Sequence, residues 1–158
     1  MVETNNFFKN NILEKSQYAL LFIPMLAVYL PTIVYPVTEE IGNNVSFRPP
    51  GYVFAIVWPI LLFLLGISWY VRRKMGYFIN SVYILLIVLL SIWFILYDNN
   101  KYYGLVDIII CFLIVLFLFF YNIKKFNKYS SLPLIPLLCW LIFASILNVA
   151  SINNQIIF

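Results

Sequence analysis

One acidic side chain falls well inside a long apolar run. Asp107 is the only charged residue in the stretch 102–123. A carboxylate at membrane depth is costly and normally faces a bundle interior, a cavity or a partner. Two roles are therefore open for Asp107: it ties helices together as a structural anchor, or it contacts a ligand directly.

A second candidate for chemistry is the pair Trp58-Pro59, which stands about two turns into the uncharged run 52–70. A proline at that position removes one backbone hydrogen bond and bends the helix. A bend beside an indole makes a recess that a flat ligand could fill. The alternative is a lipid-facing tryptophan beside a proline that transmembrane helices tolerate.

The last apolar run carries a stripe of four residues spaced i, i+4, i+8 and i+11: Trp140, Ala144, Asn148 and Ser151. That spacing places them on one face of a helix. An indole, a small residue and two hydrogen-bonding groups suit either tight helix packing or one wall of a pocket. Periodicity alone favours packing, and Gly66 in an earlier run invites the same interpretation.

The sequence offers no catalytic or metal-binding constellation. It has no histidine, no carboxylate pair within a span and no glycine-rich phosphate loop. Cys111 and Cys139 both stand inside apolar runs, far apart, and are expected to be reduced core residues rather than metal ligands. These absences favour binding over catalysis and leave enzyme activity without a candidate nucleophile or base.

Composition identifies the elements that must position these residues. Of the 158 residues, 64% are hydrophobic and only 10% are charged, against about 25% charged in soluble domains. The chain is therefore expected to be an integral, multi-pass membrane protein in contact with the lipid bilayer. Both the odd and the even positions of these runs are apolar, whereas the strands of a membrane barrel alternate polar and apolar residues. The pattern therefore predicts helices rather than a barrel. The net charge of +4 is dispersed in short clusters, so no nucleic-acid partner is expected.

Breaks in hydropathy predict an all-α membrane protein, a bundle of five transmembrane helices in one domain over residues 1–158. The expected spans cover about 18–35, 52–71, 77–97, 102–123 and 132–152. Pro24 and Pro31 predict local kinks in the first span. The longest connection, 36–51, contains Arg48 followed by Pro-Pro-Gly, and a loop of that length often forms a lid or part of a site.

Lysine and arginine predict the orientation. Five spans put the N-terminus and the second and fourth connections on one side of the membrane. That side carries eight basic residues: Lys9, Lys15, Arg72, Arg73, Lys74, Lys124, Lys125 and Lys128. The other side carries two, Arg48 and Lys101. The positive-inside rule therefore predicts a cytoplasmic N-terminus.

Two stretches now point to one family, and a shorter one between them agrees. R-P-P-G-Y-V-F-A-I-V-W-P-I-L-L-F-L-L-G (48–66) resembles the first-loop and second-helix signature of the TspO/MBR family, the translocator or tryptophan-rich sensory proteins. P-L-L-C-W-L-I-F-A-S-I-L-N (136–148) resembles that family's fifth-helix motif, and Y-G-L-V-D (103–107) resembles the start of its fourth helix. The length and the five spans agree, so the resemblance covers nearly the whole chain.

The resemblance implies a membrane receptor, regulator or translocator that binds a tetrapyrrole such as protoporphyrin IX or haem, without an obligatory cofactor. It also implies a pocket under the loop 36–51 and, in many members, a homodimer. Trp58 and Trp140 would supply flat walls, and Asp107 and Asn148 polar contacts. Matched residue by residue, the ligand-binding candidates are Tyr52, Trp58, Tyr103, Asp107, Trp140, Phe143, Ala144, Leu147 and Asn148.

Departures from the family pattern limit what the resemblance implies. The chain has four tryptophans; Tyr52 and Tyr103 stand where tryptophan is common, and Trp93 is the only one in the third span. These changes argue against the alternative of a light-dependent porphyrin-degrading enzyme. The residues after Asn148 lack the tyrosine and basic residue of the proposed sterol motif, so cholesterol binding is not expected. A structural or assembly protein with a vestigial pocket is a further alternative.

Overall fold

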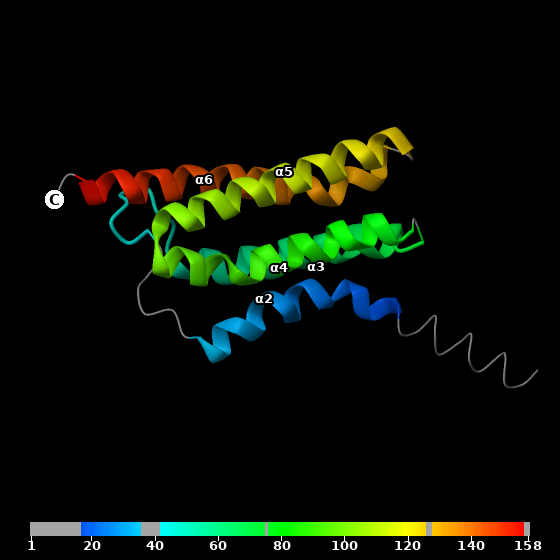
Figure 1. The fold of residues 1–158 in the computed structure, drawn as a ribbon, viewed down its shortest axis with the longest axis horizontal. Helices are drawn as coiled ribbons and strands as arrows, with labels where there is room; N and C mark the ends of the chain where they lie inside the picture. Colours follow the sequence, from blue (N-terminus) through cyan, green and yellow to red (C-terminus); the bar gives the residue numbers. More distant parts are fainter. Residues whose placement is uncertain (1–16, 36–41, 75, 126–127, 157–158) are drawn as a thin grey trace, which may run out of the picture.

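A computed structural model describes residues 17–35, 42–74, 76–125 and 128–156 (Figure 1). Every regular element in these ranges is helical, and five are α-helices, as predicted. The elements in chain order are η1 (Tyr18–Leu21), α2 (Ile23–Val34), α3 (Gly51–Arg72), α4 (Tyr77–Asn99), α5 (Lys101–Lys125), η2 (Lys128–Leu134) and α6 (Ile135–Ile156).

Four of the five helices are long and apolar enough to cross a membrane: α3, α4, α5 and the stretch Ser131–Asn153 that includes most of α6. The prediction of an all-α integral membrane protein is thus confirmed. The remaining helix, α2, has 12 residues, so about 18 Å of helix, and the short η1 precedes it. The fifth span was predicted to end near residue 152, but α6 continues to Ile156.

The two prolines of the first span act differently. Pro24 lies in the first turn of α2, where its missing N–H would have had no intrahelical partner; the helix begins there, after η1, instead of bending. Pro31 lies inside α2 and frees a carbonyl one turn earlier. The expected kink near Pro24 is therefore a junction between a 3-10 turn and an α-helix.

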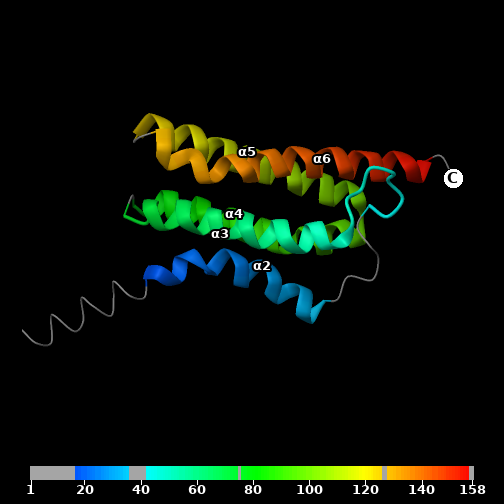
Figure 2. The same cartoon turned by 180° about the vertical axis from the view of Figure 1, so that it is seen from behind.

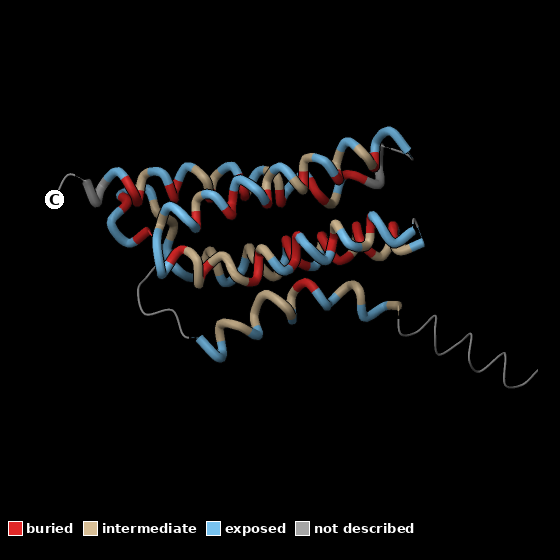
Figure 3. The backbone as a smooth tube through the Cα atoms, viewed as in Figure 1, coloured by how far each residue is buried: buried red, intermediate tan, exposed pale blue. Residues whose placement is uncertain are grey.

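The helices form a two-layer bundle with α2 on one outer side. In Figure 1 and in the reverse view of Figure 2, α5 runs beside α6, and α2 runs along the outer side of α3 and α4, which it contacts. Buried positions face the spaces between helices, whereas the exposed positions lie on the outer faces (Figure 3). Many apolar side chains remain exposed, including Leu26, Phe63 and Phe120, as expected for helices that contact lipid.

Two glycines mark close helix contacts. A Cβ on Gly66 would lie 2.8 Å from the carbonyl carbon of Leu21, so η1 packs directly on α3. A Cβ on Gly104 would lie 2.8 Å from the Cβ of Tyr97, so α4 and α5 approach closely beside their connecting turn. The packing interpretation of Gly66 is confirmed.

A buried polar cluster connects α3, α4 and α5 at the other end of the bundle. The hydroxyl of Tyr83 is 2.7 Å from Ser68 Oγ and accepts a hydrogen bond from Asn122 Nδ2 at 3.4 Å. All three residues are fully buried. Trp69 stacks on the Tyr83 ring, so polar and aromatic contacts together fix how these three helices pack.

Candidate functional site

Four aromatic side chains gather between α3 and α6. The ring of Trp140 lies 5.7 Å from that of Phe54 and 6.4 Å from that of Trp58, both in edge-to-face geometry, and 5.3 Å from that of Phe143. Such separations are typical of favourable aromatic pairs. The family resemblance implies that Trp58 and Trp140 supply flat walls of one site, and the structure brings the two rings into contact.

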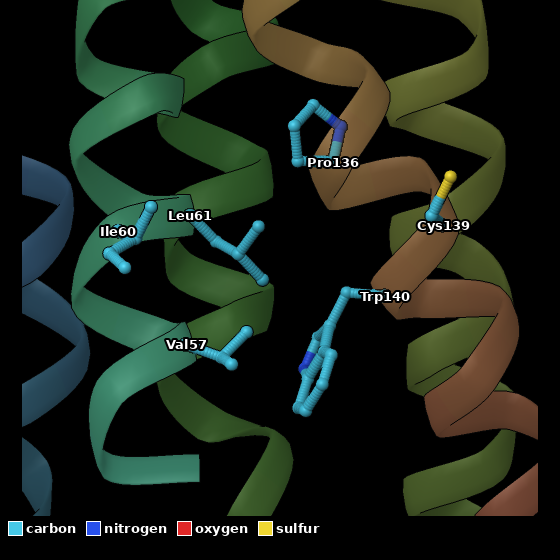
Figure 4. Close-up of a pocket in the computed structure, with 6 residues that line it drawn as sticks. All are labelled: Val57, Ile60, Leu61, Pro136, Cys139 and Trp140. Atoms are coloured by element: carbon cyan, nitrogen blue, oxygen red, sulfur yellow. The ribbon is translucent and has the colours of Figure 1, made fainter. Parts of the chain in front are cut away.

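A groove of about 430 Å³ runs beside this aromatic cluster. In the close-up, side chains of α3 face side chains of α6 across the gap (Figure 4). The two helices touch little along their length, so the groove opens between them. Its lining is almost entirely apolar: Val57, Ile60, Leu61, Pro136, Cys139 and Trp140.

The start of α3 explains how its aromatic residues reach this groove. Pro50 is the residue that precedes the helix, with extended backbone angles, and its carbonyl accepts the first hydrogen bond from the Val53 amide at 2.9 Å. Phe54 and Trp58 then stand one turn apart on the same face. Pro59 is accommodated within an unbroken α3. Tyr52 lies in the first turn and is 66% exposed.

The segment 42–50 covers the end of the bundle next to the groove, and a chain of hydrogen bonds holds it there. The Gly42 amide donates to the Tyr97 hydroxyl at 3.2 Å, and that hydroxyl lies 2.8 Å from Ser151 Oγ. Ser151 Oγ in turn donates to Asn44 Oδ1, and Asn44 Nδ2 donates to the Ser151 carbonyl, both at 3.0 Å. We call these four residues the latch. They connect the loop to α4 and α6.

Three of the predicted site residues, Ala144, Leu147 and Asn148, are buried on α6. A Cβ on Gly42 would meet Leu147 at 3.3 Å, so the loop rests on this side chain. Asn148 Nδ2 donates to the Ala144 carbonyl at 2.7 Å, and within the described residues its Oδ1 has no hydrogen-bond partner. Asn148 is 1% exposed, so this buried acceptor is a place where an added donor would be stabilising.

Tyr103 and Asp107 lie elsewhere. They line a second groove, of about 300 Å³, between α4 and α5. Among the residues that the structure describes, none lines both grooves. Eight of the nine predicted site residues thus divide into three sets: Trp58, Trp140 and Phe143 in the aromatic cluster beside the α3–α6 groove, three buried residues of α6 under the loop, and two residues in the α4–α5 groove. Tyr52 is exposed and belongs to none of these sets.

Sequence reasoning assigned no role to Pro136, which lines the α3–α6 groove, or to Phe54, which packs on Trp140 beside it. Phe54 precedes Trp58 by four positions and Pro136 precedes Trp140 by four, so helical spacing could have placed each beside its partner. The sequence places Arg48 in the Pro-Pro turn and in the charge count that predicts orientation, and neither assigns it to the site. Its guanidinium carbon lies 5.5 Å from the centroid of the Phe54 ring, which places a positive charge at the loop end of the aromatic cluster.

Comparison with known proteins now identifies this architecture. Residues 21–153 match the TspO/MBR family. The chain belongs to this family. A tryptophan-rich protein TspO of Archaeoglobus fulgidus is 36% identical over 110 residues, which cover 66% of this chain and 71% of the relative. A protein of the same name from Chlorobaculum tepidum is 30% identical over 129 residues, which cover 76% and 75% of the two chains.

Membership in the TspO/MBR family agrees with the helical bundle and its apolar surface. The matched residues include all four long apolar helices or most of each. Two of the four tryptophans of this chain, Trp58 and Trp140, are in the aromatic cluster of the α3–α6 groove. This TspO-family membrane protein therefore has an apolar groove between two of its helices, with an aromatic cluster beside it.

Proposed function

We propose that this TspO-family protein binds a tetrapyrrole, of the protoporphyrin IX or haem type, in the α3–α6 groove, and acts as a receptor, regulator or translocator for it. The observation that carries the proposal is the position of Trp58 and Trp140, whose rings lie 6.4 Å apart beside an open apolar groove. The function is a proposal about a binding site rather than about catalysis.

The shape and chemistry of the groove suit a flat, conjugated macrocycle. Its volume of about 430 Å³ lies within the usual range of small-molecule sites, roughly 300–1,000 Å³. Aromatic rings from α3 and α6 can stack on the faces or edges of such a ligand. Because α3 and α6 touch little, a ligand can enter between them from the bilayer.

Arg48 supports an orientation for the ligand. Porphyrins of this type carry carboxylate side chains on one edge, and a guanidinium binds carboxylates strongly and with defined geometry. Arg48 lies at the loop end of the aromatic cluster, beside Phe54. We infer that the carboxylates point toward the loop and the membrane surface, while the apolar edge of the macrocycle lies deeper between the helices.

The test is a protoporphyrin IX titration of the full chain in lipid nanodiscs, followed by ligand absorption and tryptophan fluorescence quenching. The variants Trp58→Leu and Trp140→Leu keep an apolar side chain but remove the indole, and each should weaken affinity about two- to tenfold. Phe120→Leu is the matched control, because Phe120 is an exposed aromatic residue of α5 that does not line the groove.

Unchanged affinity in the double variant Trp58→Leu/Trp140→Leu would refute the proposed site. Equal weakening by Phe120→Leu would indicate non-specific partitioning into lipid rather than a groove. A thermal unfolding curve of each variant separates loss of binding from loss of fold.

A further inference from the structure

The groove between α4 and α5 contains a buried acidic side chain, which is unusual for a lipid-facing surface. Asp107 lies in it and is only 3% exposed. Apart from Asp107 and Tyr103, the described residues that line it are aliphatic: Leu89, Ile92, Leu96, Val106 and Ile110. The groove therefore combines a single buried carboxyl group with an apolar channel.

The carboxyl group of Asp107 is poorly satisfied by the protein. Among the described residues, the thiol of Cys111 donates to it, with Sγ 4.0 Å from Oδ2. A thiol is a weak donor, and that distance is long. A buried carboxyl group in a membrane span normally has a strong partner, because leaving it without one is costly. A donor from outside the chain would supply what the helices do not.

Polarity changes along the groove. Helices α4 and α5 are antiparallel, so Tyr103 and Leu96 mark the end nearest their connecting turn, and Leu89 and Ile110 the deeper end. Asp107 lies about 9 Å along α5 from its first residue. The groove is polar toward the membrane surface and apolar toward the bilayer centre, which is the polarity of a lipid-embedded amphiphile.

We propose that the α4–α5 groove is a second ligand site, which binds a long-chain primary amine. The ammonium group donates to the Asp107 carboxylate, and the Tyr103 ring lies at the mouth, where a cation on its way to Asp107 passes. The alkyl chain lies along the aliphatic lining toward Ile110. Charge complementarity selects an amine over a fatty acid, and a charged donor gives a stronger bond than an alcohol.

This site is independent of the proposed tetrapyrrole site. The two grooves share no lining residue and lie on different helix pairs. Loss of one binding activity should therefore leave the other intact, so failure of either proposal can be recognised separately.

The experiment uses hexadecylamine with a diazirine in its chain, added to the full protein in phosphatidylcholine nanodiscs and cross-linked by light. Peptide mass spectrometry then locates the adducts. We expect saturable labelling of the α4–α5 groove that unlabelled hexadecylamine displaces and hexadecanol displaces at least tenfold less well. Asp107→Asn should weaken labelling at least about tenfold. Asp98→Asn is the matched control, because Asp98 is an exposed acid near the same end of α4.

A second variant tests the same groove without changing Asp107, so the proposal stays testable if Asp107→Asn does not fold. Val106→Trp places a large side chain in the groove at a position that is 55% exposed, and it should also abolish saturable labelling. Labelling that does not saturate, or that is equal in Asp107→Asn and Asp98→Asn, would overturn the proposal. So would a change in oligomeric state on Asp107→Asn with labelling unchanged, because the groove would then be a contact between copies of the chain.

Discussion

Replacing Asn44 by alanine should loosen the loop that covers the buried half of the site. The Asn44 side chain both accepts from Ser151 Oγ and donates to the Ser151 carbonyl, each at 3.0 Å. These two bonds connect residues separated by 107 positions in the chain. They are the part of the latch that a single surface substitution can remove without leaving a cavity.

The expected magnitude follows from the number and exposure of the bonds. A typical intramolecular hydrogen bond contributes about 0.5–1.5 kcal/mol. Asn44 itself is exposed, so water competes for its amide and the lower part of that range applies. Two bonds then contribute about 1–2 kcal/mol to loop closure, and their loss should raise the population of the open loop about 5- to 30-fold.

Amide hydrogen exchange measures this opening directly. The amides of Gly42, Val45 and Arg48 are hydrogen-bonded in the closed loop, to Tyr97 Oη and to the Gly42 and Val45 carbonyls respectively. Peptides that cover 42–50 should exchange about 5- to 30-fold faster in Asn44→Ala, while peptides of α5 should not change. Faster dissociation of bound porphyrin should accompany the faster exchange.

Asn43→Ala is the control for Asn44→Ala. Asn43 is the neighbouring exposed asparagine, and it makes none of the hydrogen bonds of the latch. If Asn44→Ala exchanges no faster than Asn43→Ala, the latch does not hold the loop. If α5 peptides accelerate equally, the substitution has destabilised the whole bundle, and the reasoning about local closure is wrong.

Two further predictions concern the packing that positions the grooves. Gly66→Ala should lower the free energy of unfolding by about 1–3 kcal/mol, because its Cβ would overlap the backbone of η1; Gly51→Ala, which has open space around its Cβ, is the control in a thermal unfolding assay. Tyr83→Phe should cost about 1–3 kcal/mol in the same assay, because it leaves the Ser68 hydroxyl buried without its partner at 2.7 Å. Tyr77→Phe, at a position 94% exposed, should have no effect, and an equal effect would contradict the role of the buried hydroxyl.

Most of the fold could be predicted because its signals are local. The limits of a span follow from the length of an uncharged run and from the residues that interrupt it. The predicted span 52–71 and α3 (Gly51–Arg72) agree for that reason. The division of the first span into η1 and α2 was harder to predict from the sequence. A proline such as Pro24 is compatible with either a kink or the start of a helix, and packing against α3 decides between them.

The site could be predicted only in part, because the helix that a given face contacts depends on how the whole bundle packs. Trp58 and Trp140 meet, since each lies on the face that its helix turns toward the other. Tyr103 and Asp107 share a face of α5, but that face borders α4. Spacing within one helix tells which residues lie together; it does not tell which other helix they meet. The orientation predicted from basic residues and the homodimer stay predictions.

The opening between α3 and α6 follows from what separates these helices at each end. At one end η2 packs against α3 immediately before α6 begins, and buried Leu134 fills the space there. At the other end the segment 42–50 leads into α3 and is fixed to α6 through the latch. The two helices are therefore bridged by intervening chain at both ends and touch little between them. A groove therefore remains between the middle parts of α3 and α6, and no conformational change is needed to form it. A ligand that packs against Trp140 in this groove would fill a space that the connections of the chain already hold open, so binding should order the loop more than it moves the helices.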